Sequence, residues 1–420
     1  MSDVTALTDD WEIRTIGSLG SVRGGKRLPK GRSLTQTPTA HPYIRVTDMQ
    51  QGRVDISELR FVPEDVAPLI RAYRIFKNDI FISVAGTLGI VGRVPADLDG
   101  ANLTENADRI TSITCDVDYL MYSLLGEPIQ NEIDSIRTVG AQPKLALGRI
   151  KQFEIPIPMS RSEQSRIAQT LRDTDDLIAT LERLIAKKQA IKQGKMQQLL
   201  TGRTRLPGFT APWTVRSLGS VGKCIRGVGY EPGVDLSTVD RPFTVRLLRA
   251  NNVQDGLIEL DGLQYVHERR VRSDQILKRG DIVVCMANGS RALVGKSALF
   301  DHSSDPRYTF GAFMGAFRVI GKEASPIYVA GLLKTHAFRS WLDVILSGSS
   351  INNLRPGDVE GFTCPMPSFE EQGAISQVLS DGDTELLSLR SRLAKARAIK
   401  TGMMQQLLTG RTRLQVEAVS

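Results

Sequence analysis

Arginine, lysine, asparagine and glutamine gather on stretches rich in glycine and proline, three before residue 158 and three after residue 213. Side chains of these types read DNA, because arginine and lysine pair with guanine, asparagine and glutamine pair with adenine, and further cations bind phosphate. The candidate DNA contacts are Arg23, Lys26, Arg27, Lys30, Arg45, Thr47, Gln142, Lys144, Arg249, Asn251, Asn252, Asn288, Ser290, Arg291, Asn352, Asn353 and Arg355.

Each of these stretches also has a purely structural explanation. Residues 23–32 carry five cations and no acid, which suits phosphate contact and suits a solvated loop nearly as well. Arg45 and Arg249 follow apolar residues at matching places, where an internal ion pair is an equal alternative. Asn352 and Asn353 fit a turn, since asparagine tolerates left-handed backbone angles.

Motifs for catalysis are missing from the sequence. We find no GxxxxGK[ST] phosphate loop, no [DN]PP[YF] tetrapeptide and no strand-borne GxGxxG. The related GTLGIVG at 86–92 leads into VGRVP, which favours a hairpin. The four cysteines and four histidines lie far apart, so we expect no metal and no cofactor on this chain.

Composition bounds the remaining possibilities. The chain has 420 residues, of which 41% are hydrophobic, and this predicts a folded protein of two or more domains. Lysine and arginine outnumber aspartate and glutamate by 54 to 46, which suits a polyanionic partner. The start has neither a basic region nor an apolar one, no long apolar run follows, and we expect a reduced, cytoplasmic setting.

One long element occurs twice. The segment 190–206 returns as 398–414 with 15 of 17 positions identical and a constant offset of 208 residues. Before each copy, alternating prolines indicate a connector, at 154–164 and 363–372. A short motif, W-x-[IV]-R-x-[IL]-G-S, occurs near the N-terminus at residues 11–18 and again after the first copy at residues 213–220. The order is therefore globule, long helix, globule, long helix.

The two globular blocks are only weakly alike, yet they share landmarks in the same order. The corresponding segments are 43–52 with 247–256, 76–87 with 277–290, and 140–158 with 348–367. Similar helices with dissimilar globules suggest that the helices meet one common partner twice, while the globules meet two different targets. Because the second block lacks a counterpart of GGKRLPKG, the blocks should not read the same half-site.

Short apolar runs such as DIFISV and DIVVCM, bounded by glycine and asparagine, predict strand-rich α/β (α+β) globules. In the repeats a 4-3-4-3 spacing predicts a coiled-coil seam. The most economical arrangement is an antiparallel pair with pseudo-two-fold symmetry, and the alternative is that each helix folds back on its own globule. The seam positions are Ile167, Leu171, Thr174, Ile178, Leu181 and Ile185, matched by Ile375, Leu379, Gly382, Leu386, Leu389 and Leu393.

Beyond the seam, both helices combine cations with a methionine and leucine stripe and contain no acid. Such a run is usually a solvated face, and its cations could also touch a nucleic-acid backbone. The apolar stripe favours helix-on-helix docking of a partner protein. The candidate partner-binding residues are Met196, Leu199, Leu200, Met404, Leu407 and Leu408.

These features resemble the specificity (S) subunits of type I restriction-modification systems. The most specific parts are MQQLLTGRTRL at both helix ends, the P-x-P…EQ segments before the helices, and LPGF…W at 206–213. The resemblance implies target-recognition domains at 1–158 and 207–367, and conserved helices at 159–206 and 368–420. It also implies docking of two methyltransferase (M) subunits, joined by restriction (R) subunits, with S-adenosylmethionine, ATP and magnesium serving those other chains.

The resulting hypothesis is a non-catalytic subunit that recognises a bipartite, asymmetric target in double-stranded DNA, with the helical pair acting as a ruler between the half-sites. Two rivals remain. One is a coiled-coil adaptor that never reads sequence. The other is a stand-alone DNA-modifying enzyme, which the missing catalytic motifs disfavour.

Overall fold

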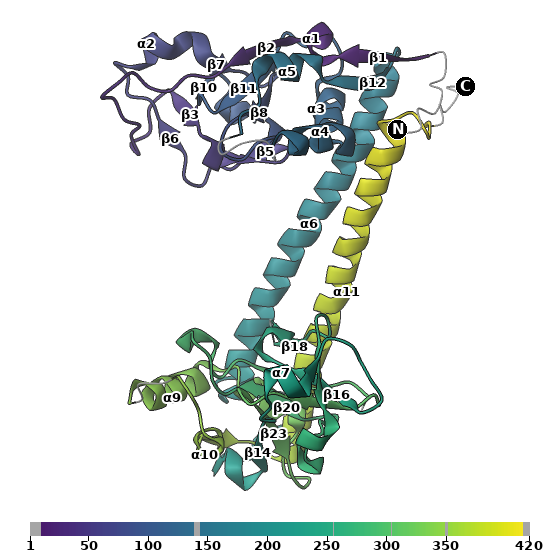
Figure 1. Ribbon diagram of the computed structural model, residues 1–420. Helices are drawn as coiled ribbons and strands as arrows, with labels where there is room; N and C mark the ends of the chain where they lie inside the picture. Colours follow the sequence, from purple (N-terminus) through teal and green to yellow (C-terminus); the bar gives the residue numbers. More distant parts are fainter. Residues whose placement is uncertain (1–9, 138–142, 255, 304, 349–351, 415–420) are drawn as a thin grey trace, which may run out of the picture. The chain divides into compact units, whose positions relative to one another are not determined.

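The computed structural model describes residues 10–137, 143–254, 256–303, 305–348 and 352–414. The chain divides into two compact units, Met1–Glu182 with Ser391–Ser420, and Arg183–Arg390. Each unit contains one strand-rich globule and parts of two long helices, α6 (Arg161–Leu200) and α11 (Phe369–Leu407) (Figure 1). None of the described helices is long and apolar enough to cross a membrane.

The described part of the first globule has two four-stranded sheets. The first sheet is antiparallel and runs β2 (Ser21–Gly24), β11 (Ala107–Thr111), β8 (Ile80–Ser83), β9 (Val91–Arg93). The second runs β6 (Arg60–Phe61), β3 (Pro42–Ile44), β10 (Ala101–Leu103), β7 (Arg74–Ile75), with β3 and β10 parallel. Two ribbons complete it: β1 (Trp11–Thr15) with β12 (Glu154–Pro158), and β4 (Met49–Gln50) with β5 (Arg53–Val54). Its helices are α1 (Ile16–Leu19), α2 (Ala67–Ile70), α3 (Val117–Leu125), α4 (Glu127–Arg137) and α5 (Leu147–Gln152).

The second globule repeats this plan. Its antiparallel sheet runs β14 (Gly222–Arg226), β23 (Met314–Val319), β20 (Ile282–Cys285), β21 (Ser297–Leu299). Its mixed sheet runs β15 (Leu236–Ser237), β19 (Gln264–His267), β16 (Thr244–Leu248), β22 (Tyr308–Phe310), with β16 and β22 parallel. The ribbons are β13 (Thr214–Ser217) with β24 (Thr363–Met366), and β17 (Val253–Gln254) with β18 (Leu257–Ile258). Its helices are α7 (Pro232–Asp235), α8 (Pro326–Leu332), α9 (His336–Ser347) and α10 (Pro356–Glu360).

The shared landmarks fall on equivalent elements, so the prediction of strand-rich α/β globules with one fold is confirmed. DIFISV contains β8 and DIVVCM contains β20, and all eight residues of these two strands are buried. Both faces of these strands are buried, which explains their continuous apolar runs. The two mixed sheets differ at both edges, because β7 is added beside β10 in the first globule whereas β15 is added beside β19, at the opposite edge, in the second.

Helices α6 and α11 are antiparallel within each unit. In the first unit Lys400 pairs with Asp175 and Arg397 with Glu182, both at 2.6 Å. In the second unit Lys188 pairs with Glu385 at 2.6 Å, and Lys192 pairs with Asp383. As residue numbers increase along α6, the residue numbers of their partners on α11 decrease. This confirms the predicted antiparallel pair.

The residues of the predicted seam pack in two different environments. Leu181, Ile185, Leu386 and Leu389 are buried along the helices, as a coiled-coil seam requires. The first seam positions of each helix, Ile167 and Leu171 on α6 and Ile375 and Leu379 on α11, instead join the apolar core of the globule in their own unit. The start of each helix therefore folds onto a globule, as the alternative interpretation of the seam proposed.

The repeated EQ and LTGRTRL motifs form an ion-paired clamp where each helix starts. Glu371 at the start of α11 is 1% exposed, and its carboxylate accepts hydrogen bonds from Arg205 Nε at 2.5 Å and Nη2 at 2.6 Å. Trp213 Nε1 donates a third, at 3.2 Å. In the first unit Arg413 donates two bonds to buried Glu163, at 2.8 and 2.7 Å. The motif is repeated because this clamp is built twice.

A glycine after each helix end lets a tryptophan approach the clamp. Gly202 and Gly410 have φ of +70° and +71°, the left-handed region that favours glycine. A Cβ added at Gly202 would lie 3.3 Å from the ring of Trp213, and one at Gly410 would lie 3.2 Å from Trp11. The same glycine therefore ends the helix and admits the ring.

Replacing Glu371 by glutamine tests the clamp. The change leaves the Arg205 guanidinium without its anion, and we expect the free energy of unfolding to fall by about 2 kcal/mol. This is less than the loss for a fully buried ion pair, because Arg205 is partly solvated. Urea unfolding followed by tryptophan fluorescence measures it. Glu370→Gln, at an exposed neighbouring position, is the control and should leave the midpoint unchanged. Equal midpoints for both variants would contradict the clamp.

Candidate nucleic-acid interface

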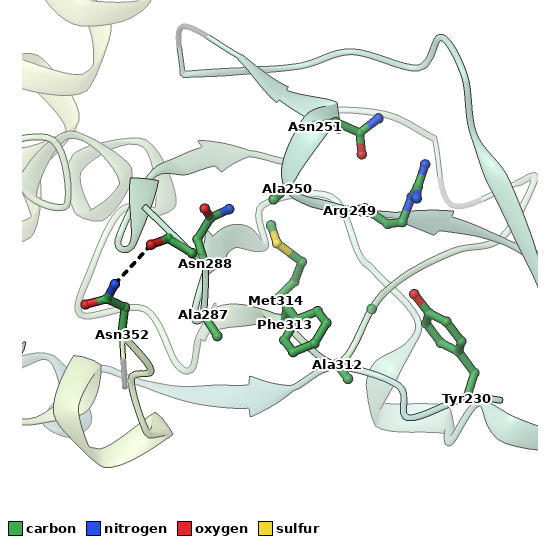
Figure 2. A pocket seen from close by; sticks show the side chains of 12 residues that line it. Tyr230, Arg249, Ala250, Asn251, Ala287, Asn288, Ala312, Phe313, Met314 and Asn352 are labelled. Carbon is green, nitrogen blue, oxygen red and sulfur yellow. Dashed lines mark hydrogen bonds between the residues drawn. The ribbon is translucent and has the colours of Figure 1, made fainter. Parts of the chain in front are cut away.

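A pocket of about 630 Å³ in the second globule collects several candidate DNA contacts (Figure 2). Arg249 and Asn251 follow β16, Asn288 follows β20, and Asn352 precedes α10. They converge because β16 and β22 are parallel neighbours, while β23 continues from β22 and pairs with β20. The connections at one end of these strands therefore meet around one hollow, which is where loops carry binding residues.

Arg249 and Arg45 occupy equivalent positions but have different partners. Arg45 donates to Asp48 through Nε at 2.9 Å and to the carbonyl of Glu58 at 2.8 Å, and the bond to Asp48 raises its pKa. Three residues after Arg249 stands the neutral Asn252. Arg249 Nε is buried and has no hydrogen-bond partner among the described residues. Arg45 therefore forms the internal ion pair that was one of its two alternatives. Arg249 instead lines the pocket, with a neutral asparagine where the first globule has Asp48.

Asn252 is a structural residue, which corrects its assignment as a base contact. It is 1% exposed and accepts from the N–H of Arg249 at 3.0 Å. Its amide donates to the carbonyls of Glu259 at 3.0 Å and Asp261 at 3.1 Å. Asp48 performs the same capping task for the N–H of Arg45, at 2.8 Å. A buried side chain whose donors and acceptor are used within the fold cannot also read a base.

The other candidates of the second globule divide by their contacts. Asn352 donates to the carbonyl of Gly289 at 3.2 Å, and the oxygen of Asn353 accepts from Arg226 at 3.1 Å. Arg291 is exposed and donates to the carbonyl of Asp343 at 2.6 Å, so α9 holds it. The exposed candidates in this globule are Asn251, Ser290, Arg291, Asn353 and Arg355.

The first globule presents its cations on β2 and the loop that follows. The ammonium of Lys26 lies 5.5 Å from the centroid of the Tyr73 ring, a cation–π distance. Arg32, in the same loop, is paired with Asp65. Gln142 lies outside the described residues. The exposed candidates in this globule are Arg23, Lys26, Arg27, Lys30, Thr47 and Lys144.

The expected methionine and leucine docking stripe is not exposed. Leu199 and Leu200 are buried in the core of the second globule, and Leu407 and Leu408 are buried in the core of the first. Met196 and Met404 are partly buried against the same cores. The periodicity correctly marked an apolar face but could not say what covers it, and the covering element is the chain's own globule.

Two exposed isoleucines occupy the repeat instead. Ile191 is 43% exposed on α6, and Ile399, its equivalent at the 208-residue offset, is 49% exposed on α11. Sequence reasoning missed both, because each is an isolated apolar residue among polar neighbours.

Groups suited to nucleophilic or metal chemistry do not gather in the described residues. No three histidine, cysteine, aspartate or glutamate side chains converge there as metal ligands. Burial raises the pKa of Cys224 to about 12 and that of Cys115 and Cys364 to about 11, so these thiols stay protonated near neutral pH.

Comparison with known proteins points to one family. The model of the type I restriction modification DNA specificity domain matches residues 8–193. The MjaVIII specificity subunit of Methanocaldococcus jannaschii is 23% identical over 427 residues, covering 97% of this chain and 94% of its own. Residues 8–193 therefore carry a type I restriction modification DNA specificity domain, and the whole chain is similar to the specificity subunits of type I restriction-modification systems.

Further similarities of the chain are partial in sequence or confined to fold. The StySPI subunit of Salmonella potsdam is 32% identical and the EcoKI subunit of Escherichia coli K12 is 29% identical. Each match covers 47% of this chain and 42% of the relative, less than half of its length. The crystal structure of a type I S subunit from M. genitalium shares the fold, with a TM-score of 0.60, 16% identity, and coverage of 97% of this chain and 99% of the other.

Sequence reasoning missed some side chains at the candidate sites. Tyr230 and Phe313 line the pocket of the second globule, and Phe313 is 67% exposed. Glu105 and Asn106 are exposed in the turn between β10 and β11 of the first globule. The turns at 104–106 and 311–313 share no residue type, so only the strand pairing shows that they correspond.

Asn251 and Asn252 provide a matched test of the division between exposed and structural residues. Asn252→Ala removes a buried cap and leaves two carbonyls and one N–H unsatisfied, so we expect a loss of about 2 kcal/mol in the free energy of unfolding. Asn251→Ala, at an exposed site, should change it by less than about 0.5 kcal/mol. Urea unfolding of both variants checks the assignment. An Asn252→Ala variant with the wild-type free energy of unfolding would show that this side chain is not structural.

Proposed function

We propose that this specificity subunit is non-catalytic, reads a bipartite and asymmetric DNA target with one half-site per globule, and carries methyltransferase and restriction subunits to that site. One observation carries the proposal. Two globules with equivalent antiparallel sheets present different chemistry at equivalent positions. Arg45 is neutralised by Asp48, whereas Arg249 is followed by the neutral Asn252 and forms no ion pair among the described residues. A duplicated scaffold with divergent surfaces is suited to two different half-sites.

The pocket residues supply the chemistry for base readout in the second globule. The guanidinium of Arg249 can pair with O6 and N7 of guanine, and the amides of Asn251 and Asn288 can pair with adenine. In the first globule Lys26, Arg27 and Lys30 lie on an exposed loop and are suited to phosphate contact. The net charge of +8 favours approach to DNA as a whole.

The repeat supports two copies of one partner. Ile191 and Ile399 are exposed at equivalent places on α6 and α11, so one methyltransferase subunit could bind each helix by the same contact. S-adenosylmethionine, ATP and magnesium would then serve the partner chains. The four cysteines are unpaired, which agrees with a reducing cytoplasm.

Arg249→Ala tests base readout. Loss of a bidentate contact to guanine costs about 1–3 kcal/mol, so methylome sequencing of a strain that carries the variant should show one half of the methylated motif relaxed and the other half intact.

Arg279→Ala is the matched control for this experiment. It removes the same charge from the same globule, at a residue that pairs with Asp301 and does not line the pocket. An unchanged motif in Arg249→Ala, or an equal change in Arg279→Ala, would contradict readout by this pocket. Absence of any bipartite motif would contradict the proposed function as a whole.

Ile191→Glu and Ile399→Glu test the repeated partner contact. A buried charge without a counter-ion is costly, so each single variant should lose one methyltransferase subunit and the double variant both, as counted by native mass spectrometry. Leu177→Glu is the control, since Leu177 is exposed on α6 but its repeat equivalent is Glu385. Full stoichiometry in the double variant would place the partner elsewhere.

A further inference from the structure

Backbone hydrogen bonds identify one turn as the same structural position in both globules. In the first, the carbonyl of Asn106 accepts from the N–H groups of Val84 and Ala85, at 2.7 and 3.2 Å. In the second, the carbonyl of Phe313 accepts from the N–H groups that follow β20, those of Met286 and Ala287, at 2.8 and 3.1 Å. Asn106 and Phe313 are therefore structural equivalents.

A second backbone hydrogen bond, from the residue that follows β2 or β14, confirms this equivalence. The N–H of Gly25, after β2, donates to the carbonyl of Ala107 at 2.9 Å. The N–H of Gly227, after β14, donates to the carbonyl of Met314 at 3.0 Å. These contacts fix the residues directly after Asn106 and Phe313, so the register between the two turns contains no slip.

Phe313 is placed for contact with a ligand rather than for packing. It is 67% exposed, whereas its neighbours Gly311 and Met314 are buried. It lines the same pocket as Arg249, Asn251 and Asn288 (Figure 2). The exposed Phe313 ring lies in a pocket that also holds donors for base edges, and this combination matches a groove that offers one apolar group among polar ones.

We propose that Phe313 contacts the 5-methyl group of a thymine in the half-site read by the second globule. This inference rests on the proposed function and names the base that one residue reads. The thymine methyl is the apolar group of the major groove, and an apolar side chain is its usual partner. In the first globule the equivalent turn offers Glu105 and Asn106, which suit hydrogen bonds to cytosine and adenine.

The test removes the methyl group from the DNA and the ring from the protein. The full chain is co-purified with its methyltransferase subunit, and the target motif is first obtained by methylome sequencing. Each thymine in the half-site that Arg249→Ala relaxes is then replaced by deoxyuridine, and affinity is measured by fluorescence anisotropy. Burial of one methyl group corresponds to about a fourfold change in affinity, so the wild type should lose about fourfold at one thymine.

Phe313→Ala should bind the thymine-containing DNA more weakly than the wild type and should no longer distinguish thymine from deoxyuridine at that position. Since Phe313 is mostly exposed, the variant should melt at the wild-type temperature, which is measured alongside. Asn106→Ala is the matched control, because it alters the equivalent turn and should affect only the other half-site.

A half-site without thymine, a wild type indifferent to every deoxyuridine, or a Phe313→Ala variant that still discriminates would overturn the inference. These outcomes leave the proposed function intact. Failure of that function would appear earlier, as a missing bipartite motif, and failure of readout by this pocket would appear as an Arg249→Ala variant with an unchanged motif.

Discussion

A buried glutamate at the start of each long helix is neutralised by an arginine from beyond the end of the other helix. Glu163 with Arg413 and Glu371 with Arg205 are the two pairs. A carboxylate this deeply buried is costly without its counter-ion, so the arginine must be present wherever the glutamate is. This requirement brings the start of one helix and the end of the other to the same globule, and it makes the helical pair antiparallel within each unit.

With the junctions fixed, the connections at the pocket end of the strands can vary without loss of the fold. Asp48 and Asn252 cap the same turn, yet only the acid neutralises the arginine beside it. The turn between β10 and β11 carries Asn106, and the equivalent turn between β22 and β23 carries Phe313, with the same backbone hydrogen bonds. The scaffold therefore constrains the backbone of these loops and leaves their side chains free to differ between the two globules, as the proposed readout of two half-sites requires.

The architecture was predictable because it repeats: the 208-residue offset identified both helices and two corresponding globules, and the 4-3-4-3 spacing with the alternating order predicted the antiparallel pairing. The sequence cannot show what covers each apolar stripe. Leu199, Leu200, Leu407 and Leu408 have the spacing of a docking surface, but they pack into the globules. Site residues were the hardest, since the roles of Arg45 and Arg249 depend on whether an acid or an amide follows three residues later. Phe313 could be recognised only from strand pairing.

The central claim is that each globule independently reads one half of the target. Its most direct test is a chain in which residues 213–366 are replaced by a second copy of residues 11–158, so that both clamps and both helices are kept. Methylome sequencing should show the second half-site replaced by an inverted copy of the first, giving a palindromic bipartite motif. An asymmetric motif that still contains the original second half-site would contradict the account.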